Sequence, residues 1–449
     1  MTVSAPPRES IQPFWFPLPP LAGIPTPLET LVEGESVSTE RGAFFRRRLS
    51  MDVEESYGMC RLGDFLRIRP HVAAALSRVP ELCDVPLNSV LFLDTETTGL
   101  AGGTGTHAFM VGLGYFQRVH GAERFTLDQC LMRTYGEERA MLTWLAEHMA
   151  QFAAIVTFNG KSFDVPLLQT RFLMSRMRLD LDEWLHFDLL HPARRLWRLA
   201  LGSCSLQQLE RHVLQVGREE DIESFLIPAI YHQYLRDGDG RYLARVFNHN
   251  RADILAMVAI ASRACSMIDE SPEDADAPST RPRLSAAEQV GLARVFEQME
   301  SLDSAERSYL AALAGVLTVE LRVRALMGLA GILKRRRRHD EAAEHWQAVV
   351  DELPAHSTQA LIELSKYWEH RRKDASRAYD LACRARDRWL GGRPIAERRL
   401  PGLASFQRAP SPSAPDDFAR RLERLDRKRR GLPVDEDQAP PDTAIGSIV

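Results

Sequence analysis

The chain has 449 residues, which is long enough for two or three domains that each bury a core. Its composition, 45% hydrophobic and 26% charged, is ordinary for a globular protein. The net charge of −4 gives no global attraction to nucleic acid, so any such binding has to come from local sites. Six scattered cysteines without a C-x-x-C pair argue against a structural zinc site or a disulfide framework, and they suit a reducing cytosol.

The first 88 residues are rich in proline, and we expect only short elements in them. They lack the basic segment followed by an apolar segment that marks a secretory signal. No apolar run in the chain approaches the roughly 20 residues that a membrane helix requires. We therefore expect a cytoplasmic protein with no membrane partner.

Residues 89–266 carry the clearest secondary-structure pattern. Apolar runs and alternation predict three strands separated by short loops, followed by helices that alternate with further strands. The expected strands are 89–97, 108–117, 124–132, 154–160 and one beginning at 186. The expected helices are 137–152, 162–177 capped by Ser162, a segment ending at 201, 205–214 and 246–265. This order is that of the ribonuclease-H-like fold, an α/β mixed sheet with helices on both faces.

We expect an acidic, proline-bearing linker at 267–283 and an all-α region at 284–391. Three similar helices in that region begin at Asp303, Asp340 and Asp374, with spacings of 37 and 34 residues. The second spacing matches the tetratricopeptide period, and small residues (Ala305, Ala342 and Ala375) allow a preceding helix to pack on each of these helices. We predict a tetratricopeptide-like helical repeat domain that can bind a protein partner, followed by a largely disordered tail at 392–449 with one basic amphipathic piece.

The segment "LFLDTETTGLAGGTGTHAF" places two carboxylates at the end of the first strand of this domain. Asp94 and Glu96 are two positions apart, so both side chains project from one face of the strand. Two like charges beside a core strand are costly unless a cation neutralises them. Alone, the pair also fits a solvated strand end.

Two later motifs add further acids. "TFNGKSFDVPLL" places Asp164 in the first turn of a helix, where the helix dipole by itself favours an acid. "HNRADILAMV" places His249 and Asp253 four positions apart on one helical face, a pairing that also occurs as a surface salt bridge. In the predicted fold, however, these elements converge on the first strand.

Together, the motifs "FLDTETTG", "TFNGKSFDVPLL" and "HNRADILAMV" resemble those of the DEDD superfamily of 3′–5′ exonucleases. The resemblance covers about residues 89 to 265. Within that superfamily the chain is similar to the YprB-type ribonuclease-H-like domain, which also tends to carry tetratricopeptide-like tails. "LHFDLLHPARRLWR" and "CSLQQLERHVLQVGREEDI" contribute to this similarity.

The resemblance implies a nuclease that hydrolyses phosphodiester bonds of DNA or RNA with two Mg²⁺ or Mn²⁺ ions. Hard divalent cations prefer oxygen ligands, and the implied ligands are Asp94, Glu96, Asp164 and Asp253. His249 is the implied general base. Its H-x3-D spacing departs from the H-x4-D of the histidine branch and matches the Y-x3-D of the tyrosine branch. His249 therefore either takes the proton or only orients the water, with Tyr231 or a neighbour as the alternative contributor.

Several polar residues near these motifs are candidates for contacts with the substrate. Asp188 either caps a helix or acts beside the site, and the arginines and lysine are solvated charges by default. The candidates for substrate binding are Thr97, Thr98, Asn159, Lys161 and Asp188, with Arg194 and Arg195 as further phosphate contacts.

Other functions fit less well. A phosphate-binding glycine loop precedes a helix, whereas "GTGTHA" leads into a strand and has no G-K-[ST]. A glycosidase would use paired carboxylates but would not need the acids on the helices. A 3′–5′ exonuclease is the preferred interpretation. The alternatives are a structure-selective endonuclease of the same fold and a catalytically weak scaffold that binds partners through its repeats.

The basic run Lys334 to Arg338 ends the first helix of the middle repeat. It fits a solvated helix C-terminus that the helix dipole favours. The other interpretation is a contact with a nucleic-acid backbone, together with "RKRRG" in the tail.

Overall fold

The computed structural model describes residues 21, 23–99, 105–179, 184–218, 221–269, 284–391 and 414–433. The chain divides into two compact units, one of residues 1–194 and 203–277 and one of residues 195–202 and 278–449. The predicted linker lies mostly outside the described residues, and its first two positions belong to a helix that ends at Ile268. Among the described helices, none is long and apolar enough to span a membrane. All six cysteines are described, and none forms a disulfide.

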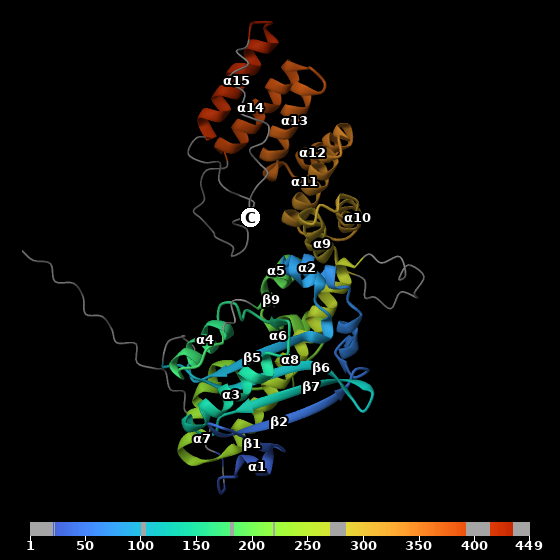
Figure 1. Ribbon diagram of the computed structural model, residues 1–449. Helices are drawn as coiled ribbons and strands as arrows, with labels where there is room; N and C mark the ends of the chain where they lie inside the picture. The colour runs from blue at the N-terminus through green and yellow to red at the C-terminus, as the bar shows by residue number, and fades with distance from the viewer. Residues whose placement is uncertain are drawn as a thin grey trace, which may run out of the picture. The chain divides into compact units, whose positions relative to one another are not determined.

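The first unit is built on a mixed sheet of seven strands in the order β1-β2-β7-β6-β5-β8-β9 (Figure 1). Strands β5, β6 and β7 form the predicted antiparallel meander, and β8 and β9 continue parallel to β5. The strands are β1 (Glu35–Thr39), β2 (Gly42–Asp52), β5 (Val90–Thr97), β6 (Ala108–Val119), β7 (Ala122–Leu131), β8 (Ala154–Thr157) and β9 (Leu185–Asp188). A separate hairpin joins β3 (Ser56–Tyr57) to β4 (Cys60–Arg61).

The structure corrects the expected boundary of this domain. Residues 1–88 were expected to hold only short elements outside the sheet, but β1 and β2 extend it beyond β7. Strand β2 alone runs over 11 residues, paired along most of its length with β7. The sheet-bearing domain therefore begins at Glu35 or earlier. Residues 1–20 lie outside the described part of the chain.

Helices cover both faces of the sheet, as predicted (Figure 1). Alternation along β5 sends Leu91 and Leu93 into the core under α3 (Glu138–Met149) and α4 (Asp164–Met174). The opposite face packs against α1 (Leu28–Leu31), α7 (Ile227–Asp237) and α8 (Gly240–Ile268). The remaining helices of the first unit are α2 (Pro70–Ser77), α6 (Leu206–Leu209) and the first part of α5 (Leu190–Leu201).

One predicted helix begins differently from expectation. Helix α4 starts at Asp164, and the residue before it, Phe163, makes no side-chain cap. Ser162 therefore does not cap this helix as we predicted. It lies instead in the turn that connects β8 to α4, where its amide donates to the carbonyl of Asn159.

The second unit is entirely helical among its described residues. Its helices are α9 (Ala286–Gln298), α10 (Leu302–Leu313), α11 (Val319–Arg335), α12 (His339–Glu352), α13 (Thr358–His370), α14 (Ala375–Gly391) and α15 (Ala414–Arg429). The helices α10, α12 and α14 begin next to the predicted aspartates. Ala305 and Ala342 are fully buried as expected, but in α14 the buried small residue is Ala378 and not Ala375.

The predicted tail contains one folded helix, α15, which is the basic amphipathic piece of the sequence. Leu422 and Leu425 of α15 pack on Ala378 and Ala382 of α14. The buried carboxylate of Glu369 also pairs with Arg421, Arg424 and Lys428 of α15. The other tail residues, 392–413 and 434–449, lie outside the described part of the chain.

The basic run Lys334 to Arg338 is largely neutralised by acids of the neighbouring helices. Lys334 pairs with Glu363 at 2.8 Å, and Arg336 and Arg338 both pair with Glu306. These ion pairs favour a structural role for those three side chains over a contact with nucleic acid.

Candidate metal-dependent active site

Strand β5 delivers two carboxylates to the face of the sheet that α8 covers. Phe92, Asp94 and Glu96 alternate with Leu91 and Leu93, which face the opposite core. Beyond Glu96 the pairing of β5 with β6 shifts register, so the regular ladder ends beside the acids. Glu96 is only 8% exposed.

Asp164 reaches the same centre from the start of α4. It is 8% exposed, and the hydroxyl of Thr95 donates to its Oδ1 at 2.6 Å. The turn before α4 requires the predicted Asn159-Gly160 pair. Asn159 has a φ of +68°, and a Cβ at Gly160 would lie 2.5 Å from the side chain of Thr157.

Helix α8 contributes His249, Asn250 and Asp253 from the same face of the sheet, where it packs over β5. The amide Nδ2 of Asn250 donates to Oδ2 of Asp94 at 2.8 Å, and its Oδ1 accepts from Nε2 of Gln129 at 3.0 Å. Gly112 lies opposite Asp94 on the neighbouring strand β6. It leaves room for this contact, because a Cβ at position 112 would lie 2.4 Å from Oδ1 of Asn250.

The cluster of Asp94, Glu96, Asp164 and Asp253 is largely buried, and the negative charges of these acids repel one another. Burial raises the pKa of Asp94 well above its ordinary value, and the charges of Asp253 and Asp164 raise it further. The pKa of Glu96 is raised in the same way by burial and by the charge of Asp94. Burial also raises the pKa of Asp164 to about 6, despite the hydrogen bond from Thr95. Such a cluster is favourable only with a nearby positive charge.

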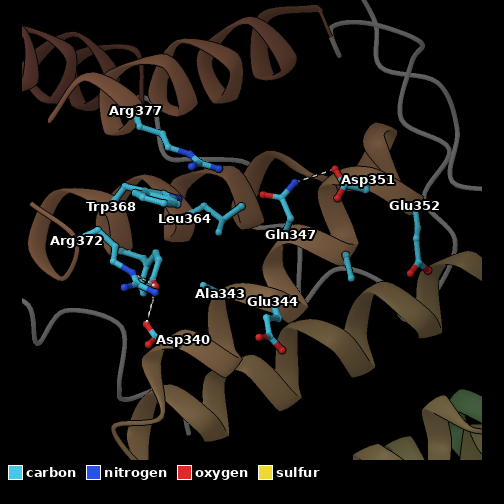
Figure 2. A pocket seen from close by; sticks show the side chains of 12 residues that line it. Asp340, Ala343, Glu344, Gln347, Asp351, Glu352, Leu364, Trp368, Arg372 and Arg377 are labelled. Atoms are coloured by element: carbon cyan, nitrogen blue, oxygen red, sulfur yellow. Dashed lines mark hydrogen bonds and ion pairs between the residues drawn. The ribbon is translucent and has the colours of Figure 1, made fainter. Parts of the chain in front are cut away.

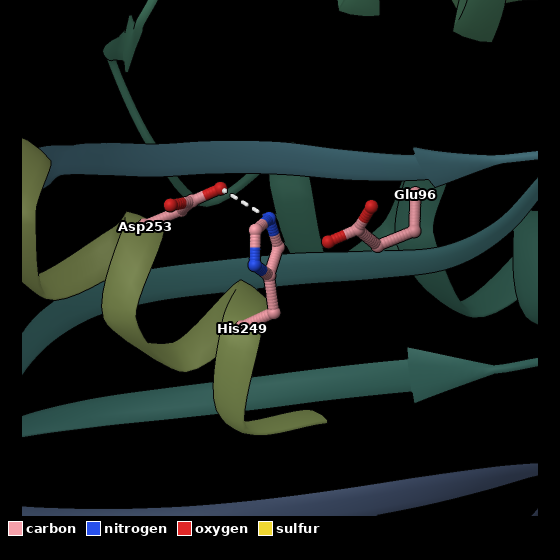
Figure 3. A group of neighbouring side chains, drawn as sticks. All are labelled: Glu96, His249 and Asp253. Carbon is pink, nitrogen blue, oxygen red and sulfur yellow. Dashed lines mark ion pairs between the residues drawn. The ribbon is translucent and has the colours of Figure 1, made fainter. Parts of the chain in front are cut away.

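His249 is held in place by the carboxylate of Asp221, a residue that was not among the predicted site residues. Its Nδ1 lies 2.8 Å from Oδ1 of Asp221, and its Nε2 lies 3.5 Å from Oδ2 of Asp253 (Figure 3). Burial lowers the pKa of His249, but the hydrogen bond to Asp221 and the charge of Asp253 outweigh burial, and the net pKa is raised. With the proton of the neutral ring on Nδ1, Nε2 is left as the basic nitrogen.

The residues fit a divalent cation. Glu96, His249 and Asp253 each offer a ligand atom, and these atoms all lie within 4.8 Å of one another (Figure 3). The Oε1 atom of Glu96 is buried and has no hydrogen-bond partner, which is costly for a carboxylate unless a cation is bound. Asp94 and Asp164 approach the same cluster closely enough to raise the pKa of Glu96.

The proposed substrate-binding residues mostly stabilise the loops around the cluster. The hydroxyl of Thr97 donates to the carbonyl of Gly99, and Oγ1 of Thr98 accepts from the amide of His107. The carboxylate of Asp188 accepts from the amides of Asn159, Lys161 and Leu190 at 2.8, 3.1 and 3.0 Å, so it holds the turn before α4 and caps α5. The side chain of Lys161 is exposed beside this turn, and so is that of Arg194 on α5, where Arg195 is half-buried.

Tyr231 is not placed to act as a base. Its side chain is fully buried, its ring stacks on Phe109 at 4.1 Å between centroids, and its hydroxyl donates to the carbonyl of Met132. The suggestion that Tyr231 contributes to catalysis is therefore wrong, because the residue belongs to the core between α7 and the sheet.

Two further charged residues near Asp253 were not predicted. Arg218 donates through Nη2 to Asp253 and lies 3.1 Å from Asp221 through Nη1. Glu210, in a π-helical turn after α6, accepts from Nε of Arg218 at 3.0 Å and from the hydroxyl of Tyr57 at 2.5 Å. Both residues lie in "CSLQQLERHVLQVGREEDI", which contributes to the family resemblance, and Arg218 lies in the charged stretch "GREEDIE", but neither segment by itself indicates the partners of these side chains.

Hollows lie beside this cluster and in the helical unit. One of about 790 Å³ adjoins this cluster and is lined by residues 207, 210, 211, 215–218 and 221–223, which include Arg211, Arg218 and Asp221. The other, of about 540 Å³, lies in the helical unit between α12 and α13–α14 (Figure 2). There Arg377 stacks on Trp368, and Asp340 pairs with Arg372.

Comparison with known proteins agrees with this fold. Residues 91–265 match the RNase H superfamily, so the chain carries a domain of that class, and the match spans all the acids of the cluster. The chain is also 32% identical over 306 residues to the protein called "Uncharacterized protein YprB" of Bacillus subtilis (strain 168), covering 66% of this chain and 68% of that protein. The chain therefore belongs to the YprB-type family of the RNase H superfamily.

Proposed function

We propose that this protein is a divalent-cation-dependent nuclease that hydrolyses phosphodiester bonds, and that it acts as a 3′–5′ exonuclease of the DEDD type on DNA or RNA. The observation that carries the proposal is the convergence of Glu96, His249 and Asp253 within 4.8 Å around a buried carboxylate oxygen without a partner. Nucleic-acid backbones bring phosphate charges that such a centre can accept only with cations present.

Asp94, Glu96, Asp164 and Asp253 would hold two Mg²⁺ or Mn²⁺ ions. Bound divalent cations supply the positive charge that stabilises the attacking and leaving oxygens of a phosphodiester. The protein fixes the acids before any ion arrives, because Asn250 orients Asp94 and Thr95 orients Asp164. Glu96 is buried, and its Oε1 has no hydrogen-bond partner, so a bound cation would supply the missing interaction.

His249 would act as the general base toward the attacking water. Asp221 accepts the Nδ1 proton, so the free electron pair of Nε2 points to the side of Asp253 and Glu96. Once His249 is protonated, the carboxylates of Asp221 and Asp253 would stabilise its positive charge, as in other histidine–carboxylate pairs. This geometry supports a role in proton transfer despite the H-x3-D spacing.

The experiment that tests the proposal measures cleavage of 5′-labelled oligonucleotides, single- and double-stranded, of DNA and RNA, with Mg²⁺, Mn²⁺ or EDTA. We expect metal-dependent shortening from the 3′ end by the wild type. Asp94→Ala and Glu96→Gln should lose at least about 100-fold in rate. Asp303→Asn, an exposed acid of the helical unit, serves as the matched control. Equal residual activity in the wild type and in Asp94→Ala would contradict the proposal.

The same assay separates the alternatives within this fold. A structure-selective endonuclease would cleave a circular single strand or a branched duplex, whereas an exonuclease requires a free 3′ end. A scaffold without activity would leave every substrate intact, and its function would then have to be sought in the helical unit, whose hollow between α12 and α13–α14 is the candidate contact for a protein partner (Figure 2).

A further inference from the structure

Arg218 occupies an unusual place for a cation in a centre that would bind metal ions. Its guanidinium contacts three carboxylates, those of Glu210, Asp221 and Asp253. Its side chain is 11% exposed, and the side chain of Glu210 is 1% exposed. An ion pair at this depth is weakly screened by solvent.

The three carboxylates that contact Arg218 differ in their relation to the proposed metal site. Glu210 and Asp221 are anchors, because Nε and Nη1 reach them while neither carboxylate belongs to the set of four predicted metal ligands. Glu210 is itself fixed by the hydroxyl of Tyr57. Asp253, by contrast, is shared between Arg218 and the proposed metal centre, and its Oδ1 is the atom that accepts from Nη2. A divalent cation and Arg218 would therefore compete for one carboxylate.

We propose that Arg218 balances the charge of Asp253 in the metal-free protein and becomes a contact for a substrate phosphate once a divalent cation engages that carboxylate. This inference rests on the proposed nuclease function and names one group that would recognise its substrate. Glu210 and Asp221 keep the guanidinium in place when Asp253 turns to the cation. Nη2 then keeps its contact with Oε2 of Glu210, at 2.7 Å, but the N–H that Asp253 accepted is left free in a largely buried position, and a phosphate oxygen can take that place.

The hollow beside Arg218 provides the route for such a phosphate. It measures about 790 Å³, and Arg218 and Asp221 form part of its wall. Gln207, Arg211 and Gln215 line it as well, so donors for phosphate and sugar oxygens surround the opening. A nucleic-acid strand in this hollow would bring its backbone to Nη2 of Arg218.

The first test measures metal binding without substrate. Calorimetric titration of Mn²⁺ into the full-length, metal-free chain compares the wild type with Arg218→Gln. Because the variant removes the competitor for Asp253, we expect it to bind Mn²⁺ about tenfold more tightly. Arg211→Gln is the matched control, since Arg211 is an exposed arginine of the same hollow and should bind Mn²⁺ as the wild type does.

The second test measures turnover on the oligonucleotide that the wild type cleaves best. At saturating Mn²⁺ we expect Arg218→Gln to lose roughly 100-fold in rate, although its metal binding is tighter. Arg218→Lys keeps the charge beside Glu210 and should recover part of that rate. If circular dichroism shows that Arg218→Gln is unfolded, Arg218→Lys replaces it in both tests. We then expect Arg218→Lys to bind Mn²⁺ more tightly than the wild type and to cleave the oligonucleotide more slowly.

The outcomes are distinct. Unchanged or weaker Mn²⁺ binding by a folded Arg218 variant would overturn the competition for Asp253. Tighter binding with an unchanged rate would overturn the phosphate contact. If the wild type binds no Mn²⁺ and cleaves nothing, the proposed function itself fails, whereas a wild type that binds and cleaves leaves only Arg218 in question.

Discussion

The amide of Asn250 donates a hydrogen bond to Asp94 across a distance of 2.8 Å, over a position on β6 where only glycine leaves room. Gln129, on the next strand, donates a second hydrogen bond, from its Nε2 to Oδ1 of Asn250. Asp94, Gly112 and Gln129 are aligned in the register of three neighbouring strands. The sheet thus fixes one carboxylate of the site through a side chain of the helix that crosses it.

The first prediction concerns Gly112. In Gly112→Ala the new Cβ would lie 2.4 Å from Oδ1 of Asn250, so the amide has to move and its hydrogen bonds to Asp94 and Gln129 are broken. We expect a loss of about 2 kcal/mol in the free energy of unfolding, measured by urea denaturation, and a fall of roughly tenfold in nuclease rate. Gly331→Ala, where a Cβ meets nothing within 4 Å in α11, is the control and should be neutral or slightly stabilising.

The second prediction concerns the charge of the metal-free site. Burial and neighbouring acids raise the pKa of Asp94, which means that its ionised form is unfavourable in the folded protein. Asp94→Asn keeps the shape and removes one repelling charge, so the metal-free variant should melt at a higher temperature than the metal-free wild type at pH 7.5. Added Mn²⁺ should raise the melting temperature of the wild type much more than that of the variant.

A lower melting temperature of the metal-free variant would contradict this prediction. If Asp94→Asn melts at a lower temperature than the wild type without metal, the hydrogen bond from Asn250 stabilises the ionised carboxylate more than the neighbouring acids destabilise it. Asp303→Asn, at an exposed position of α10, controls for the loss of a charge in general.

Much of the site could be predicted because it follows from local periodicity. The alternation of "SVLFLDTET" places Asp94 and Glu96 on one face, and the strand–turn–helix order places Asp164 at the start of α4. Three strands followed by helix–strand alternation leaves few arrangements for a mixed sheet. The elements that bring the acids together are therefore encoded in short stretches of the chain.

Other features depend on contacts between distant segments. Asp221 and Arg218 lie in an irregular stretch after the π-helical turn, and only the packing of that stretch on α8 brings them to His249 and Asp253. Strands β1 and β2 are rich in polar and basic residues because they lie toward the edge of the sheet, so they lack the apolar runs that marked β5 and β6. Tyr231 was misassigned because its sequence position gives no indication of its burial against Phe109.

The third prediction concerns Phe163, an exposed aromatic residue immediately before Asp164. Phe163 is 58% exposed, although phenylalanine is usually buried. If the neighbouring cluster is the proposed nuclease centre, this aromatic ring can stack on a base of a single strand, which contributes about 1–3 kcal/mol. We expect Phe163→Ala to raise KM for single-stranded substrates by roughly tenfold with little change in kcat. Leu173→Ala, at a residue of α4 that is 69% exposed, should leave both constants unchanged.

The fourth prediction concerns the attachment of α15 and its dependence on pH. Burial tends to raise the pKa of Glu369, but Lys428, Arg424 and Arg421 more than offset this, and the net pKa is lowered. A carboxyl group whose pKa is lower in the folded state stabilises that state above its unfolded pKa of about 4.3, and this contribution is lost as the pH falls through the folded pKa. We therefore expect α15 to detach from α13 and α14 as the pH falls below this unfolded value and through the lowered pKa of Glu369.

Hydrogen exchange measured at several pH values would detect this detachment as a loss of protection in residues 414–433, and it should begin before the helices α9 to α12 lose protection. At neutral pH, Glu369→Gln should produce the same local loss, because three basic side chains are left without their common acceptor, at a cost of roughly 2 kcal/mol. Glu352→Gln, whose carboxylate is half exposed and pairs with Arg322, should change protection of α15 very little. Protection of α15 that persists in Glu369→Gln would show that Leu422 and Leu425 suffice to hold the helix on α14.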